Sequence, residues 1–124
     1  MPNASLYVFQ TDARGYYAPV NQRAENEARI HGYLRTDRSG EFEVTTIRPG
    51  GYPNSTLPEH VHFFVNANGY DERVFEIVFS DDPRMNDRIR SDARTPDSFY
   101  SMCTPSRQNA TLHCSTTVQM KRVR

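Results

Sequence analysis

The segment PGGYPNSTLPEHVHFFV, residues 49–65, ends in an alternating run that is typical of a β-strand. Successive side chains of a strand point to opposite faces, so His60, His62 and Phe64 would share one face. Packing alone rarely favours two neighbouring imidazoles, because each brings polar nitrogens that need partners when buried. A metal ion would satisfy both rings. The segment therefore predicts a strand that carries two metal ligands.

Strand patterns of the same kind recur along the chain, separated by residues that favour turns, such as Asn68-Gly69 and Pro49-Gly50-Gly51. We expect six strands, over residues 5–12, 30–37, 40–47, 60–66, 74–80 and 116–123. Short strands joined by hairpin-length turns indicate an all-β fold, an antiparallel β-sandwich. Residues 83–101 are rich in charges and contain Pro96, so we expect a long, mostly irregular connection there with at most one short helix.

Composition sets the broad class. The chain has 124 residues, of which 36% are hydrophobic, and this length predicts a single domain over residues 1–124. Fifteen basic and fifteen acidic residues cancel, which argues against nucleic acid and anionic membranes as partners. No run is long and apolar enough for a membrane span, and MPNASLYVFQ lacks the features of a signal peptide. We expect a soluble protein.

Localisation stays open at this stage. Cys103 and Cys114 match no zinc pattern, which leaves two buried thiols or one disulfide that closes a short loop. Three N-x-S/T triplets, starting at Asn3, Asn54 and Asn109, add some weight to secretion. The cytoplasm is the favoured location, and secretion is the alternative.

Two common histidine sites fit the pattern poorly. A cupin barrel would place a glutamate shortly after His-x-His, where this chain has Asn66 and Ala67. A zinc hydrolase would usually recruit a third His, Asp or Cys, and nothing ties His31 or His113 to the pair.

Tyrosine is the better supply of further ligands. Tyr52 lies close to the histidines in sequence and is held between Gly51 and Pro53. A trivalent cation such as Fe(III) can lower the pKa of a phenol far enough to bind it as phenolate, as bound metals do for water.

The chain resembles the intradiol ring-cleavage dioxygenases, the protocatechuate 3,4-dioxygenase-like family. Four blocks carry the resemblance in order over residues 5–83: YVFQTDARGYYAP, GYLRTDRSGEFEVTTIRPGGYP, EHVHFFV and IVFSDDP. The resemblance implies a transthyretin-like (prealbumin-like) sandwich core and a non-haem Fe(III) ion. The residues on which the family's ligands fall are Tyr17, Tyr52, His60 and His62.

The resemblance also implies an activity. The enzyme would insert O₂ into a catechol-type aromatic diol to give a muconate-type diacid. Tyr52 would be catalytic, because the family's equivalent tyrosinate leaves the iron with a proton from the substrate. Many relatives assemble, so a homo-oligomer is open.

Two positions depart from the family pattern. Leu57 stands where the family usually has an arginine that faces the substrate, and Glu76 stands where glutamine is common. Losing a fixed cation beside a developing anion removes transition-state stabilisation. Either the substrate or the activity has changed, or another arginine compensates; the candidates are Arg14, Arg23, Arg48 and Arg73.

The departures keep a second hypothesis open. The chain could be a transthyretin-like module that binds a ligand or partner and retains a vestigial or weakly active metal site. Colour separates the two hypotheses, because tyrosinate bound to Fe(III) absorbs visible light.

Overall fold

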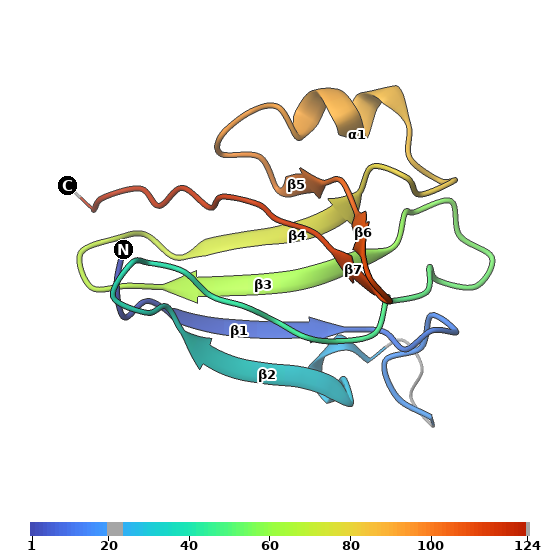
Figure 1. Cartoon of the computed structure of the whole chain (residues 1–124), viewed down its shortest axis with the longest axis horizontal. Helices are drawn as coiled ribbons and strands as arrows, with labels where there is room; N and C mark the ends of the chain where they lie inside the picture. The colour runs from blue at the N-terminus through green and yellow to red at the C-terminus, as the bar shows by residue number, and fades with distance from the viewer. Residues whose placement is uncertain (20–23, 124) are drawn as a thin grey trace.

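The computed structural model describes residues 1–19 and 24–123 as one mixed but mainly antiparallel β-structure (Figure 1). Its elements are β1 (Ser5–Gln10), the 3-10 helix η1 (Glu25–Glu27), β2 (Ile30–Arg35), β3 (His60–Asn66), β4 (Arg73–Phe79), α1 (Asp87–Asp92), β5 (Tyr100–Cys103), β6 (Ser106–Gln108) and β7 (Thr111–His113). Five strands form one sheet in the order β2-β1-β3-β4-β5, and β6 pairs with β7 as a separate hairpin.

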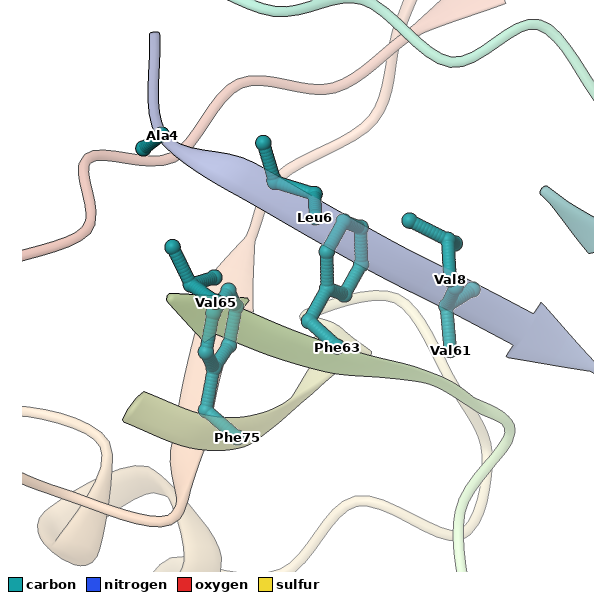
Figure 2. Packing of buried hydrophobic residues seen from close by; sticks show 7 residues of the cluster. All are labelled: Ala4, Leu6, Val8, Val61, Phe63, Val65 and Phe75. Carbon is teal, nitrogen blue, oxygen red and sulfur yellow. The ribbon is translucent and has the colours of Figure 1, made fainter. Parts of the chain in front are cut away.

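One face of the large sheet carries the hydrophobic core. The alternation of β1, β3 and β4 places small and large apolar side chains on this face, where they interlock as Figure 2 shows. The buried residues of this cluster are Ala4, Leu6, Val8, Val61, Phe63, Val65 and Phe75. Phe42, Val118 and Met120 pack over them from two extended segments that cross the sheet. These segments form the second layer, so the fold is sandwich-like and all-β, as the sequence predicts.

Four of the expected strands form, and two do not. Residues 40–47 and 116–123 run as extended chain without a ladder of backbone hydrogen bonds, apart from one bridge between Tyr70 and Arg122. The first segment alternates in sequence, but only Phe42 of its side chains contributes to the core cluster. Strand preference depends on a neighbouring strand and a buried face, and a single anchoring residue does not provide them. The second segment keeps the predicted alternation, with residues 116, 118 and 120 half-buried.

The long connection behaves largely as expected. Residues 83–101 contain one short helix, α1, whose N-cap Asn86 accepts a hydrogen bond from the backbone N–H of Ile89. The connection then returns β5 to the sheet, where it pairs parallel with β4. The predicted antiparallel character therefore holds for the other pairs of the large sheet, and the β4–β5 edge is parallel.

Cys103 and Cys114 form a disulfide, which decides between the two alternatives left by the sequence. The bond joins the end of β5 to the residue after β7 and encloses the β6–β7 hairpin. Disulfides are typical of proteins in oxidising compartments.

Asparagines occupy the left-handed backbone region at three exposed positions. Asn3, Asn54 and Asn109 have φ of 59°, 58° and 58°, a conformation that asparagine tolerates better than most residues. These are the asparagines of the three N-x-S/T triplets, so turn geometry accounts for each of them. In the described part of the chain, no helix has the length and apolar character needed to cross a membrane.

We expect reduction of the disulfide to lower the free energy of unfolding by about 3 kcal/mol, because the bond restricts the unfolded chain over a short loop. Urea unfolding with and without reductant measures the difference. The Cys103→Ala/Cys114→Ala double variant is the control and should not respond to reductant. Equal stability of oxidised and reduced wild type would contradict the prediction.

Candidate metal centre

The second face of the sheet carries the polar cluster. His60 and His62 project from β3 on the face opposite Val61 and Phe63, and both are buried, with exposed fractions of 7% and 8%. Phe9 of β1 lies directly across from His62 in the register. The two rings stack with centroids 4.3 Å apart and planes 4° from parallel, which fixes the orientation of the His62 ring.

Two interlocked turns bring the tyrosines to this face. The N–H of Gly50 donates to the carbonyl of Asp12 (2.8 Å), and the hydroxyl of Thr11 donates to the carbonyl of Gly50 (2.8 Å). Gly15 has φ of 90°, and a Cβ there would overlap the carbonyl oxygen of Gly51. Backbone contacts and the Thr11 hydroxyl thus hold the chain after β1 against the loop before β3.

These contacts between the two turns place Tyr17 and Tyr52 against each other and against the histidines. The Tyr17 hydroxyl lies 2.7 Å from Nε2 of His62, and the Tyr52 hydroxyl lies 3.1 Å from Nε2 of His60. The two hydroxyls are themselves in hydrogen-bond contact. The structure therefore brings all four sequence-predicted residues together, with two phenol oxygens and two imidazole nitrogens facing one point.

The Nδ1 atoms of both imidazoles also have partners within hydrogen-bond distance. Nδ1 of His60 lies 2.8 Å from the carbonyl oxygen of Pro58, which can only accept, so Nδ1 donates there and Nε2 is the nitrogen that faces Tyr52. Nδ1 of His62 lies 3.2 Å from Oε2 of Glu76, its cross-strand neighbour on β4. An ionised Glu76 accepts the Nδ1–H and leaves Nε2 of His62 as a ligand atom.

Burial sets the charge state of the cluster. It lowers the pKa of His62 to about 3, with a further contribution from His60, so the imidazole is neutral and its contact with Glu76 is a hydrogen bond rather than an ion pair. Burial is also the largest cause of the raised pKa of Tyr17, and the hydrogen bond between the Tyr17 and Tyr52 hydroxyls adds to it. The Tyr17 phenol therefore stays protonated unless a cation binds beside it, and neutral imidazole with phenolate suits Fe(III).

Glu76 and the two histidines form an alternative group of possible metal ligands. Donor atoms of His60, His62 and Glu76 lie within 4.8 Å of one another. However, Glu76 contacts His62 at Nδ1, while Tyr17 contacts it at Nε2, and these two ring nitrogens point away from each other. One ion at the point shared with the tyrosines leaves Glu76 as the group that orients His62. Burial raises the pKa of Glu76.

The arginines proposed to compensate for Leu57 are mostly engaged elsewhere. Arg48 binds Asp81 at 2.7 and 3.1 Å, and Arg73 donates to the carbonyls of Val74 and Ser98. Arg14 lies over the ring of Tyr16. Arg23 lies outside the described residues.

Arg84 is the residue that sequence reasoning missed. Its Nη1 lies 3.3 Å from the carbonyl oxygens of both Tyr52 and Leu57, while the Leu57 side chain is 45% exposed. Arg84 follows the last block of the resemblance, and only the folding of the 49–57 loop brings it near Tyr52. No local pattern indicated it.

Comparison with known proteins gives consistent results. A family model described as "Dioxygenase" matches residues 1–113. The chain is similar to catechol 1,2-dioxygenase of Acinetobacter baylyi, with 28% identity over 100 residues that cover 67% of this chain and 32% of that protein. Catechol 1,2-dioxygenase of Candida albicans is 24% identical over 99 residues, covering 67% and 33%. The chain spans about a third of the length of these curated relatives.

Solved structures share the fold. The 3-chlorocatechol 1,2-dioxygenase of Rhodococcus opacus superimposes with a TM-score of 0.70 at 20% identity, covering 99% of this chain and 55% of that chain. The dioxygenase domain of a carbohydrate-binding fusion protein from a Streptomyces species gives a TM-score of 0.66 at 22% identity, covering 92% and 65%.

Proposed function

Because this chain belongs to the intradiol ring-cleavage dioxygenase family, we propose that it is a non-haem Fe(III) enzyme that inserts O₂ into a catechol-type aromatic diol. The product would be a muconate-type diacid. The observation that carries the proposal is the convergence of four donor atoms, from Tyr17, Tyr52, His60 and His62, on one buried point.

The four residues fit iron in their chemistry as well as their placement. His60 and His62 would bind through Nε2, because hydrogen bonds to Pro58 and Glu76 engage their Nδ1 atoms. Tyr17 and Tyr52 would bind through their phenol oxygens. When bound, iron(III) would supply Lewis acidity and a template that orients the diol.

The two tyrosines differ in a way that supports separate roles. Tyr17 is 2% exposed and packs with Phe9 and Ala28, so it would stay in place through the reaction. Tyr52 lies on a loop and is only half-buried, so of the two tyrosines it would be the one that leaves the metal. We assign proton transfer to Tyr52, whose phenolate oxygen would accept a proton from a diol hydroxyl.

The alternative function is a transthyretin-like binding module with a vestigial or weakly active metal site. The observation in its favour is that the Leu57 side chain is partly exposed and brings no charge to the site. Iron content and colour of the purified protein decide between the two, since a colourless, iron-free protein that gains no visible band with added Fe(III) would favour the module.

We expect Tyr17→Phe and Tyr52→Phe each to shift or bleach the visible tyrosinate-to-Fe(III) band, because each removes one oxygen donor and leaves the ring packing. Absorption spectra of the iron-loaded variants, with circular dichroism to verify folding, measure the effect. Tyr16→Phe, next to Tyr17 in sequence, is the matched control and should leave the band unchanged. A variant with an unchanged band would remove its tyrosine from the ligand set.

A further inference from the structure

The backbone of Arg84 is held close to His60, the first of the two histidines. Asp82 is buried, and its carboxylate accepts the backbone N–H of Glu59 at 2.6 Å and of Arg84 at 2.8 Å. Glu59 immediately precedes His60. The backbone of Arg84 is thereby fixed relative to the strand that carries both histidines.

The guanidinium of Arg84 spans the loop that carries Tyr52. Nη1 lies 3.3 Å from the carbonyl oxygen of Tyr52 and 3.3 Å from that of Leu57, near the two ends of the segment 52–57. A charged donor between two carbonyl oxygens is stronger than a neutral one, and the planar guanidinium limits the geometries available to it.

Gly51 provides the space for this arrangement. A Cβ on Gly51 would overlap Nη1 of Arg84 and lie 2.8 Å from its Cζ, and the three nearest atoms all belong to Arg84. The φ of Gly51 is not positive, so the backbone does not require glycine here. The guanidinium requires it instead.

We propose that Arg84 is a positioning residue for Tyr52. It ties the backbone of the 52–57 loop to the base of β3, so that the phenol of Tyr52 can leave and return to one position while the loop stays in place. Arg84 also brings a cation to the loop on which the family resemblance expects an arginine at position 57. The inference rests on the proposed function, in which Tyr52 binds iron and transfers a proton.

The test is the visible spectrum of iron-loaded Arg84→Met, which keeps the length of the side chain and removes its charge and donors. The band should weaken, and Fe(III) affinity should fall about three- to tenfold, less than the 10- to 100-fold typical of residues bonded directly to a ligand. Arg84→Lys, which keeps the charge, should retain more of the band. Arg38→Met, in an exposed turn, is the matched control.

Double variants separate an effect through Tyr52 from a general structural effect. In a Tyr52→Phe background, Arg84→Met should change the remaining band no further, whereas in a Tyr17→Phe background it should weaken it. Gly51→Ala should reproduce the spectrum of Arg84→Met, because it displaces the guanidinium without changing Arg84. Equal effects in both tyrosine backgrounds would overturn the proposal.

An iron-free measurement keeps the inference distinct from the proposed function. Hydrogen exchange of the Leu57 backbone amide, which donates to Oγ of Ser55, should become about tenfold faster in metal-free Arg84→Met, because the loop opens more often without its tether. Unchanged exchange would overturn the positioning role. If the wild type had no visible band, the proposed function would fail, and the exchange result would still decide whether Arg84 holds the loop.

Discussion

His62→Ala is expected to reduce Fe(III) affinity by more than about 100-fold if His62 binds iron as proposed, because loss of a ligand should exceed the 10- to 100-fold cost of losing a group that only orients one. The ring of His62 contacts Phe9, His60, Tyr17 and Glu76 in the cluster. Its removal leaves three donors and frees Glu76 to turn toward the site. Competition for iron with a chelator of known affinity measures the loss.

The control for this variant is His31→Ala. His31 lies on β2, is exposed, and places its Nδ1 2.8 Å from the carbonyl oxygen of Ala28 rather than near the four donors. It should bind iron like the wild type. A His62→Ala protein that stays folded, as judged by its thermal unfolding, and binds iron within threefold of wild type would remove His62 from the ligand set.

Phe75→Ala is expected to destabilise the fold by about 3–5 kcal/mol, a large part of the 5–15 kcal/mol typical of a domain. Phe75 is 1% exposed and stacks on Phe63 with ring centroids 5.0 Å apart, within the packed cluster of Figure 2. Truncation leaves a cavity that neighbouring strands, held by ladder hydrogen bonds, cannot close. Urea denaturation monitored by circular dichroism gives the change in free energy.

Phe99→Ala is the matched control, because Phe99 is 48% exposed and its loss should cost less than about 1 kcal/mol. If the two variants unfolded at the same urea concentration, the assignment of the core to this face of the sheet would be wrong.

The sequence predicts the parts of the fold that depend on local alternation. β1, β2, β3 and β4 alternate and also find neighbours, so pattern and structure agree. β5 is only four residues long and forms because the 83–101 connection returns it to the edge of β4. β6 and β7 are exposed three-residue strands within the loop closed by the disulfide. Neither β5 nor the β6–β7 hairpin produces a periodic pattern in the sequence.

The candidate site, too, could be predicted from the sequence only in part. The alternation of residues 60–65 predicted that two imidazoles share a face, and the family resemblance indicated the tyrosines. The partner of His62 could not be predicted, because it depends on the register that sets Glu76 opposite His62. Arg84 could not be predicted either, since its neighbours are backbone carbonyls, which no sequence pattern marks.

The interlocked turns and the β1–β3 pairing have a consequence for the order of events in folding. Tyr17 and Tyr52 are 35 positions apart, and Tyr17 and His62 are 45 apart, so the donor atoms meet only through contacts of long sequence separation. Such contacts form late, after the entropy of closing large loops has been overcome. Iron would therefore bind after folding. The free energy of iron binding would raise the population of the native state and would not speed folding.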